Sequence, residues 1–282
     1  MKLAHGQVAV VTGAASGIGF ALAEALCQRG LSVMLADVEH GALEAAQQRL
    51  SQSGHSVAAH AADVTDPAAV QRLAAATVER FRHVDLLVCN AGVGGSLGPI
   101  WTSDPKDWSW TFGVNVFGVV HALQAFLPAM VARGQGHVVN VASLAGVTSP
   151  PFLAPYVASK HAVVALSESL AGELAAANAP IKVSVVCPGM VQTRIFESER
   201  NRPAELRAES QTPPQVLDRL RAALVARMVA PMPEPELADK AIAGIEQDDF
   251  LILTHTQSNP EILARLARMQ SAVQHSQAEA TR

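Results

Sequence analysis

Short apolar runs rich in valine, leucine and alanine alternate along this chain with longer stretches in which apolar residues recur every three or four positions. The first pattern predicts strands and the second predicts amphipathic helices. Several short runs are apolar at consecutive positions, which is typical of parallel strands buried on both faces. The predicted strands are Val8–Thr12, Ser32–Ala36, Ser56–Ala61, Asp85–Cys89, His137–Ala142, Lys182–Cys187 and Phe250–Leu253.

The predicted helices fall between these strands, at Gly19–Arg29, Gly41–Ser51, Pro67–Phe81, Asp107–Arg133 and Tyr156–Ala177. Strands that alternate with helices form βαβ units, in which the strands lie parallel. The expected fold class is therefore α/β, with a doubly wound parallel sheet of seven strands and helices on both faces.

No segment with the composition of a linker divides this series, so we expect residues 1–269 to form a single domain. The one compositional break is a proline-rich, charged excursion within 190–236, between the last two strands. Loops of this length usually serve a function, and we interpret Phe196–Glu236 as part of the same domain. The polar residues 270–282 are expected to form a frayed C-terminal tail.

Composition narrows the class of protein. Hydrophobic residues make up 49% of the chain and charged residues 16%, which favours a globular protein with a sizeable core over a disordered chain. The net charge is -4, and charges of both signs are interspersed, so no basic stripe is available to neutralise a phosphate backbone. We therefore expect no nucleic-acid partner.

Cysteine and histidine spacing predicts no metal site. Cys27, Cys89 and Cys187 lie far apart and form no CxxC pair, and the ten histidines show no HExxH pattern. The N-terminus lacks the long apolar region and cleavage site of a signal peptide, and no segment approaches roughly 18 uninterrupted apolar residues. We expect a cytoplasmic protein with no membrane partner.

The first predicted strand runs into a glycine turn, Thr12–Gly19, that precedes a helix. Glycines let the backbone approach a pyrophosphate, and the helix N-terminus offers free N–H groups to the anion. The spacing is GxxxGxG rather than GxGxxG, and three glycines in a turn are also ordinary loop chemistry. The order strand, glycine turn and helix nevertheless favours a Rossmann-type dinucleotide site.

Asp37 stands at the end of the second predicted strand, 18 residues after Gly19. A carboxylate at about this distance accepts the hydroxyls of the adenosine ribose in dinucleotide sites. It would repel a 2′-phosphate, and Val38 supplies no cation to compensate, so NAD is the expected cofactor. The alternative is that Asp37 only caps a helix.

The single tyrosine, Tyr156, precedes Lys160 by four residues. On a helix this spacing places the phenol and the ammonium on one face. A free phenol has a pKa of about 10, which must fall to about 7 if the phenolate is to act as a base near neutrality. One cation about 4 Å away supplies around 4 kcal/mol at an effective dielectric of 20, which is the required scale. YxxxK alone more often marks a surface pair.

Ser143 follows a predicted parallel strand, at the end where doubly wound sheets bind ligands. Its hydroxyl is therefore a candidate donor to a substrate oxygen beside Tyr156. Asn115 is a polar residue among apolar neighbours in the long predicted helix. A helix-packing amide and a functional amide explain Asn115 equally well.

Taken together, these motifs resemble the short-chain dehydrogenase/reductase family from about residue 6 to residue 255. The motifs that carry the resemblance are TGAASGIG at Thr12–Gly19, ADVT at Ala62–Thr65, CNAG at Cys89–Gly92, NVFG at Asn115–Gly118, Ser143, YVASK at Tyr156–Lys160, and Pro188–Gly189 with Thr193. Cys89 departs from the family, which more often has asparagine there.

The resemblance implies a catalytic tetrad of Asn115, Ser143, Tyr156 and Lys160. In such enzymes the tyrosine exchanges a proton with the substrate oxygen, the serine positions that oxygen, the lysine lowers the tyrosine pKa and binds the nicotinamide ribose, and the asparagine supports a water relay. The implied cofactor-binding residues are Gly13, Ser16, Gly17, Ile18, Gly19, Asp37, Asp63, Val64, Asn90, Ala91, Gly92, Tyr156, Lys160, Pro188, Gly189 and Thr193.

The expected substrate side is mostly apolar, which favours a bulky or aromatic secondary alcohol or its ketone. Arg194 reaches a substrate carboxylate only if it turns inward, so acidic substrates are disfavoured. Asn201-Arg202-Pro203 and the ending Phe250–His255 give a weaker resemblance to bacterial Cα-dehydrogenases of lignin-derived aryl ethers. The substrate-lining residues we expect are Ser143, Leu144, Val147, Phe152, Leu153, Met190, Ile195 and Phe196.

The family resemblance also implies a homotetramer or dimer built partly on the helices Asp107–Arg133 and Tyr156–Ala177. The expected function is hydride transfer between NAD(H) and a secondary alcohol or ketone, with Tyr156 as general acid and base. One alternative is an NADPH-dependent carbonyl reductase of the same fold. The other is a dinucleotide-binding sensor without catalytic activity.

Overall fold

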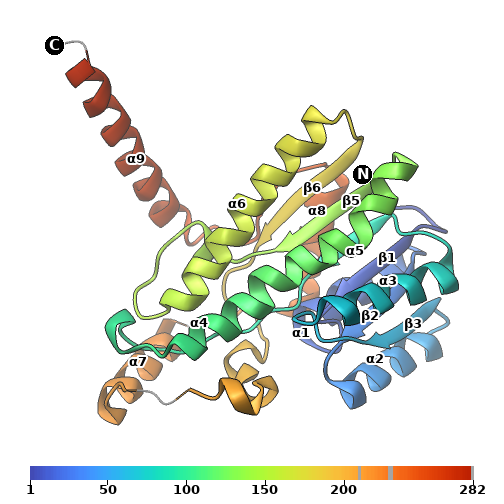
Figure 1. Cartoon of the computed structure of the whole chain (residues 1–282), viewed down its shortest axis with the longest axis horizontal. Helices are drawn as coiled ribbons and strands as arrows, with labels where there is room; N and C mark the ends of the chain where they lie inside the picture. Colours follow the sequence, from blue (N-terminus) through green and yellow to red (C-terminus); the bar gives the residue numbers. More distant parts are fainter. Residues whose placement is uncertain (209–210, 228–230, 281–282) are drawn as a thin grey trace.

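The strands form one parallel sheet in the order β3-β2-β1-β4-β5-β6-β7, in a computed structural model that describes residues 1–208, 211–227 and 231–280 (Figure 1). The predicted fold class is confirmed, and every predicted strand is present with ends that differ by at most one residue. The strands are β1 (Val8–Thr12), β2 (Ser32–Asp37), β3 (Val57–Ala61), β4 (Leu86–Cys89), β5 (Gly136–Val141), β6 (Ile181–Cys187) and β7 (Leu251–Leu253).

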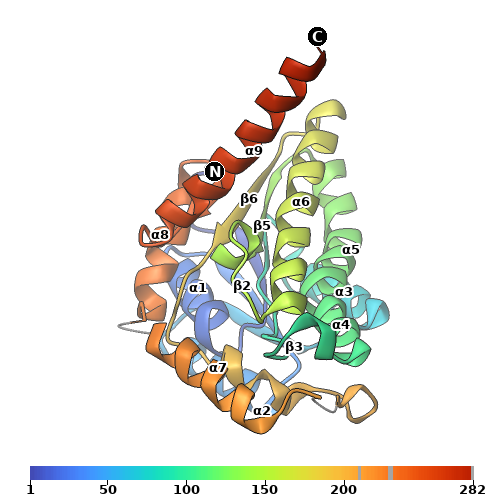
Figure 2. The same ribbon diagram turned by 90° about the vertical axis from the view of Figure 1, so that its left-hand side faces the viewer.

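Both faces of the sheet are covered, which explains why its strands are apolar without alternation. In β1, Ala9 and Val11 belong to one core and Val10 to the other. Figure 2 shows α1 and α8 on one side of the sheet and α3, α5 and α6 on the other. The covering helices are α1 (Gly17–Gln28), α2 (His40–Gln52) and α8 (Glu234–Glu246) on the first face, and α3 (Pro67–Phe81), α5 (Gly118–Arg133) and α6 (Ala154–Ala176) on the second.

The helix predicted over Asp107–Arg133 is interrupted. It begins as α4 (Pro105–Phe112), passes through a π-helical turn over Gly113–Phe117 and continues as α5. Asp104 caps its start by accepting a hydrogen bond from the Lys106 N–H. A π turn inserts one residue into the helical repeat and is often found at functional sites. Here it contains Asn115.

This stretch, Pro105–Arg133, is long and apolar enough to cross a membrane by length and composition, although the sequence predicted no such segment. Covering helices of soluble proteins share these properties. In the structure α5 packs against α3 and β4, and α4 packs against α6. We therefore interpret it as a helix that covers the sheet.

The excursion predicted within 190–236 leaves and rejoins the domain at one point. Val191 and Met232 form an isolated parallel bridge, supported by the hydrogen bond from the Met232 N–H to the Met190 carbonyl at 3.0 Å. Its described elements are the 3₁₀ helices η4 (Ile195–Asn201) and η5 (Ala204–Leu206) and helix α7 (Pro214–Arg227). Two further 3₁₀ helices lie elsewhere, η1 (Ile100–Thr102) and η3 (Leu144–Gly146).

The C-terminal residues differ from the frayed tail that we predicted. Helix α9 (Asn259–Ala280) continues through residues 270–280 and points away from the body of the domain in both views (Figures 1 and 2). Only its first turns contact the domain, where Ile262 packs against the second core. Four apolar side chains on it are more than half exposed, namely Leu263, Leu266, Met269 and Val273.

Candidate active site

A cavity of about 840 Å³ lies at the carboxyl ends of the strands, beside the point where the strand order reverses between β1 and β4. This is where doubly wound sheets bind their ligands. All but one of the predicted cofactor residues line the cavity, and the exception is Gly19. Those that line it are Gly13, Ser16, Gly17, Ile18, Asp37, Asp63, Val64, Asn90, Ala91, Gly92, Tyr156, Lys160, Pro188, Gly189 and Thr193.

The glycine turn after β1 requires glycine for both conformation and space. Gly13 and Gly17 have φ values of +65° and +55°, in the left-handed region that favours glycine. A Cβ atom on Gly19 would overlap the carbonyl oxygen of Gly13 and crowd the Asn90 amide. Gly19 is therefore a packing residue beneath the turn, while Gly13 and Gly17 form the cavity wall.

The N-terminus of α1 fits a phosphate group. Ser16 is the N-cap residue, and its side chain makes no capping hydrogen bond to the helix. The first N–H groups of a helix have no partner within the helix, and they carry the positive end of its dipole. Ser16, Gly17 and Ile18 all line the cavity. The turn therefore suits the pyrophosphate of a dinucleotide.

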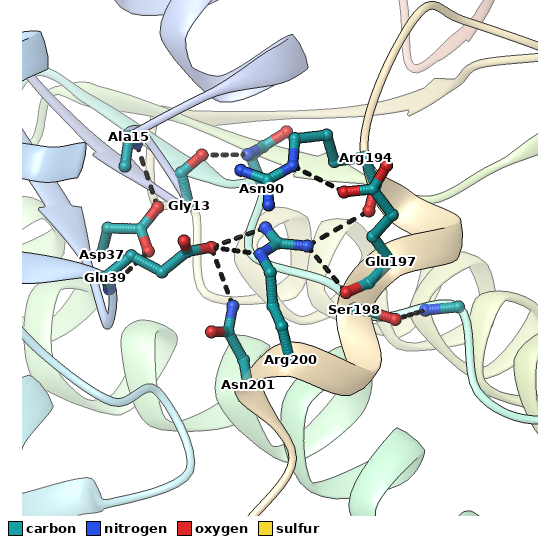
Figure 3. A network of polar contacts seen from close by, with 11 residues as sticks. Gly13, Ala15, Asp37, Glu39, Asn90, Arg194, Glu197, Ser198, Arg200 and Asn201 are labelled. Carbon is teal, nitrogen blue, oxygen red and sulfur yellow. Dashed lines mark hydrogen bonds and ion pairs between the residues drawn. The ribbon is translucent and has the colours of Figure 1, made fainter.

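Asp37 is held at the cavity wall by backbone donors (Figure 3). Its Oδ2 accepts a hydrogen bond from the Ala15 N–H at 3.0 Å, and its Oδ1 accepts one from the Glu39 N–H at 3.0 Å. Each carboxylate oxygen has a further lone pair, so Asp37 can still accept ribose hydroxyls. Because no helix-capping hydrogen bond engages the Asp37 side chain, the capping alternative is not supported.

Asn90 ties β4 to the glycine turn. Its side-chain amide donates to the carbonyl oxygens of Thr12 at 2.9 Å and Gly13 at 3.1 Å, and its own N–H donates to the Thr12 hydroxyl at 3.0 Å. Asp63 closes a turn by accepting hydrogen bonds from the N–H and hydroxyl of Thr65, both at 2.8 Å. These bonds fix the walls on either side of the β1 turn.

Ser143 follows β5 and begins η3. Its Oγ accepts a hydrogen bond from the Ala145 N–H at 3.1 Å and donates one to the Pro188 carbonyl at 3.4 Å. The Ser143 side chain also lies near the Tyr156 phenol and acts to lower its pKa. Both side chains line the cavity. Serine and tyrosine, separated in sequence, therefore present two adjacent hydroxyl groups to one site.

Lys160 lies beneath this pair. Its Nζ is 5.8 Å from the centroid of the Tyr156 ring and donates a hydrogen bond to the Val141 carbonyl at 3.0 Å. Only 4% of the Lys160 surface is exposed. No carboxylate among the described residues forms an ion pair with it, and burial lowers the pKa of Lys160 to about 8.

The pKa of Tyr156 differs from our expectation. Burial raises it above its ordinary value, although part of the side chain is open to the cavity, and the Ser143 side chain opposes this shift only in part. Lys160 does not lower the pKa of Tyr156 in this structure.

Asn115 joins three segments. Its Oδ1 accepts from the Val93 N–H at 2.8 Å, while its Nδ2 donates to the Val93 carbonyl at 3.0 Å and to the Ser159 Oγ at 2.9 Å. Ser159 in turn donates to the Tyr156 carbonyl at 2.8 Å. The side chain itself does not line the cavity. In this structure Asn115 positions the catalytic helix α6 against the loop after β4.

His255, at the end of β7, was missed by sequence reasoning. Its Nδ1 accepts from the Gly189 N–H at 3.0 Å, and its Nε2 lies 3.0 Å from the Met190 carbonyl. Burial lowers the pKa of His255, which favours the neutral ring with its proton on Nε2. A polar residue at the carboxyl end of the last strand is the signal that marks it. It fixes the Pro188–Gly189 turn in the cavity wall.

The substrate side contains most of the residues we predicted. Val147 and Phe152 are the exceptions, because neither lines the cavity. Phe152 adopts a φ of +68° and is 40% exposed. The predicted residues that do line the cavity are Ser143, Leu144, Leu153, Met190, Ile195 and Phe196, and others that we did not predict are Trp110, Val114, Leu206, Gln257 and Glu261.

Arg194 lines the cavity but already has a partner. Its Nε is 2.8 Å from the Glu197 carboxylate, one turn along η4. The Arg194 guanidinium is therefore paired with a carboxylate in this structure. Among the described residues, no three metal-binding side chains gather into a metal site. The three cysteines are buried, and burial raises each thiol pKa to about 12.

The short chain dehydrogenase family matches residues 7–204 of this chain. This range includes the glycine turn, Asp37, Ser143, Tyr156 and Lys160. The chain belongs to the short-chain dehydrogenase/reductase family. The resemblance inferred from the motifs is thereby confirmed, and the protein is an oxidoreductase of this family.

Two relatives illustrate the sequence similarity of this chain to the family. A CLA biosynthesis dehydrogenase/reductase of Lactiplantibacillus plantarum is 34% identical over 272 residues, which cover 95% of each chain. A 1-deoxy-11-beta-hydroxypentalenate dehydrogenase of Streptomyces avermitilis is 42% identical over 189 residues, which cover 66% of this chain and 69% of that protein.

A solved short-chain dehydrogenase/reductase from Burkholderia phymatum, in complex with NAD, is 40% identical. The match covers 96% of this chain and 97% of that one, with a TM-score of 0.91. Together with the phosphate-binding turn and Asp37, this supports the dinucleotide that we predicted as cofactor. The short-chain dehydrogenase fold and the cofactor class therefore agree between the motifs, the geometry and the relatives.

Proposed function

We propose that this protein transfers a hydride between NAD(H) and a bulky or aromatic secondary alcohol or its ketone. One observation carries the proposal. The side chains of Ser143 and Tyr156 lie near each other and near the buried amine of Lys160, in the same cavity as the glycine turn. A site for hydride exchange and a site for proton exchange are thus adjacent.

The bound cofactor supplies hydride chemistry at its nicotinamide ring. The chain's own residues bind the substrate oxygen and exchange a proton with it. Ser143 donates a hydrogen bond that holds the oxygen, and the Ala145 N–H fixes the position of the Ser143 Oγ that donates it. Tyr156 takes the hydroxyl proton when an alcohol is oxidised and returns one when a ketone is reduced. Asn115 positions the helix that carries Tyr156 through Ser159, and we retain its support of a water relay as part of the proposal.

The Tyr156 pKa sets a condition on this role. Burial raises it in the protein alone, so the phenolate becomes accessible only when more positive charge is present. A protonated Lys160 and an oxidised nicotinamide ring provide that charge together. The proposal therefore links cofactor binding to activation of the general base.

The preference for NAD over NADP rests on Asp37. Its carboxylate lines the cavity, and backbone donors fix it in place. A 2′-phosphate at the adenosine ribose would lie beside this negative charge. The apolar wall, which includes Leu144, Leu153 and Phe196, favours a bulky apolar substrate, and the Cα-dehydrogenases of lignin-derived aryl ethers provide the model for it.

The proposal is tested by mixing the protein with NAD or NADP and a panel of aryl secondary alcohols, and with NADH or NADPH and the matching ketones. Turnover is followed at the absorbance band of the reduced nicotinamide. We expect NAD-linked turnover, and we expect Tyr156→Phe to lose at least about 10³-fold in kcat/KM. Ser169→Ala, on an exposed face of the same helix, is the control and should retain full activity.

Each rival has its own outcome. Faster turnover with NADPH than with NADH would support the carbonyl reductase and contradict the role given to Asp37. Tight NADH binding without turnover across the whole panel would support the sensor. Undiminished turnover in Tyr156→Phe would contradict the proposed proton transfer, even if NAD remained the cofactor.

Location and assembly complete the proposal. We expect a cytoplasmic homotetramer or dimer in which α4, α5 and α6 contact a second copy. Phe117, in the π turn between α4 and α5, is 54% exposed on this helical layer. Light scattering on the purified protein determines the number of copies.

A further inference from the structure

Glu39 and Arg200 form an ion pair across the mouth of the cavity, 161 residues apart in sequence (Figure 3). Glu39 lies just after β2, two residues beyond Asp37, while Arg200 lies in η4 of the excursion. The Glu39 Oε1 accepts from Arg200 Nε at 3.0 Å and Nη2 at 2.5 Å, and from Asn201 Nδ2 at 2.9 Å. One carboxylate oxygen thus holds two neighbouring side chains of the excursion.

The remaining Arg200 nitrogen stabilises η4 itself. Its Nη1 donates to the carbonyl oxygens of Arg194 at 3.3 Å and Glu197 at 3.0 Å. A planar guanidinium has its donors in a fixed arrangement. The orientation of the Arg200 guanidinium is therefore set by Glu39 and by the η4 carbonyl oxygens together. Movement of Arg200 away from Glu39 would therefore also disturb the η4 backbone.

A second attachment fixes η4 on the opposite side of the cavity. The Ser198 Oγ accepts a hydrogen bond from the Gly94 N–H at 3.0 Å, in the loop after β4. Glu39, Gly94, Ser198 and Arg200 all line the cavity. Helix η4 consequently spans from the end of β2 to the end of β4, which are the two sides of the expected dinucleotide site.

We infer that the Glu39–Arg200 pair is a latch that holds η4 closed over the dinucleotide and slows its release. Both residues are positioning residues in this role, since Arg200 is already committed to Glu39 and to backbone carbonyls. The inference rests on the proposed function, because it requires a dinucleotide to bind in this cavity.

The surroundings make the pair stronger than an ordinary surface ion pair. The Arg200 and Glu39 side chains are 27% and 24% exposed, so solvent screens them only in part. The hydrogen bond from Arg200 is the main cause of the lowered pKa of Glu39, which keeps this carboxylate charged at neutral pH. Charge-assisted hydrogen bonds of this kind are about twice as strong as neutral ones.

The test measures release of NADH by stopped flow, through the fluorescence of bound NADH after mixing with excess NAD. The variants are Glu39→Gln, Arg200→Gln and the double variant, all in the full chain. We expect each single variant to release NADH about tenfold faster. We expect the double variant to resemble the single ones rather than to multiply their effects, because both act on one interaction.

Salt and protease provide independent readouts. Raising the salt concentration should speed NADH release from the unsubstituted protein and change little in Glu39→Gln, where the ion pair is absent. With NADH bound, trypsin should cleave after Arg207 faster in Glu39→Gln. The matched control is Glu236→Gln, which removes the exposed ion pair with Lys240 at 2.9 Å on α8 and should match the unsubstituted protein in every assay.

Failure of the latch is distinguishable from failure of the proposed function. Unchanged NADH release in both single variants, in a protein that binds NADH and turns over NAD, overturns the latch alone. Multiplicative effects in the double variant also overturn it, since the two residues would then act separately. A protein that binds no NADH contradicts the proposed function, and the latch with it.

Discussion

The Nζ of Lys160 donates a hydrogen bond to the carbonyl oxygen of Val141, the last residue of β5, at 3.0 Å. This bond attaches the catalytic helix to the strand that leads into Ser143. It is also one of few polar contacts available to a deeply buried amine, whose pKa falls to about 8 because of burial. The site therefore carries a cost that stability measurements can detect.

We predict that Lys160→Met stabilises the cofactor-free protein at neutral pH while abolishing activity. A lysine whose folded pKa is about 8, against an ordinary 10.5, is more easily protonated in the unfolded chain. Between pH 8 and 10.5 the unfolded lysine therefore holds a proton that the folded lysine has lost. The free energy of unfolding should rise with pH across this range. The penalty at pH 7 is of order 3 kcal/mol, at 1.36 kcal/mol per pKa unit.

Urea unfolding of both proteins at pH 7 and pH 10.5 checks this prediction. The advantage of Lys160→Met should be largest at pH 7 and should be almost gone at pH 10.5, where the folded lysine is neutral and half of the unfolded lysine is neutral. An advantage that stays constant with pH would assign the effect to packing. The other titrating residues are the same in both proteins. Their contributions therefore cancel in the difference between the two free energies of unfolding.

A second prediction concerns two glycines in helices. Gly19→Ala should prevent folding or dinucleotide binding, because its Cβ would overlap the Gly13 carbonyl, which a backbone atom cannot easily avoid. Gly172→Ala, on the exposed face of α6, meets no atom within 4 Å and should stabilise the protein by about 1 kcal/mol. Thermal unfolding and NADH titration compare them, and a Gly19→Ala protein that binds NADH normally would contradict the steric argument.

A third prediction separates the bonds of Asn115. Asn115→Ala leaves the buried N–H and carbonyl of Val93 without their partner and should cost about 2–3 kcal/mol of unfolding free energy. Ser159→Ala removes one of the three bonds of Asn115, together with the bond that Ser159 donates to the Tyr156 carbonyl, and should cost about 1–2 kcal/mol. Urea denaturation measures both values. Equal costs would show that the amide acts mainly through Ser159 rather than through Val93.

Periodic patterns predicted the regular parts of this protein well. The residues of β4 and the first four residues of β1 are apolar because both faces of the sheet are covered, and the glycine turn, Asp37 and Ser143 stand at strand ends where the fold must bring them together. These signals are local, so a single sequence contains them.

The features that the sequence did not predict depend on contacts between distant residues. The π turn around Asn115 preserves an apolar helical pattern, so nothing in the periodicity marks it. The bond between Glu39 and Arg200 joins the end of β2 to an excursion whose path no pattern specifies. The direction of the Tyr156 pKa shift depends on burial in the folded protein, which residue spacing alone does not give.

The last prediction concerns the buried ion pair at the base of the excursion. Arg202 donates to Asp107 on α4 at 2.6 Å and stacks over the Trp110 ring at 4.3 Å, and the Arg202 and Asp107 side chains are 3% and 6% exposed. Breaking a buried pair leaves an uncompensated charge, so Arg202→Met should cost about 3–5 kcal/mol. Arg221→Gln, which removes the exposed ion pair with Asp218, is the control and should stay within about 0.5 kcal/mol.

The double variant Asp107→Leu/Arg202→Met should recover most of the stability lost in Arg202→Met. The ion pair is imperfectly satisfied, because the Arg202 Nε has no hydrogen-bond partner among the described residues. Two apolar side chains of similar size avoid the cost of burying both charges, and such replacements are often neutral or stabilising. Urea unfolding of the single and double variants decides the matter. A double variant as unstable as Arg202→Met would contradict this expectation. It would show that the attraction between the two charges exceeds the free-energy cost of burying them.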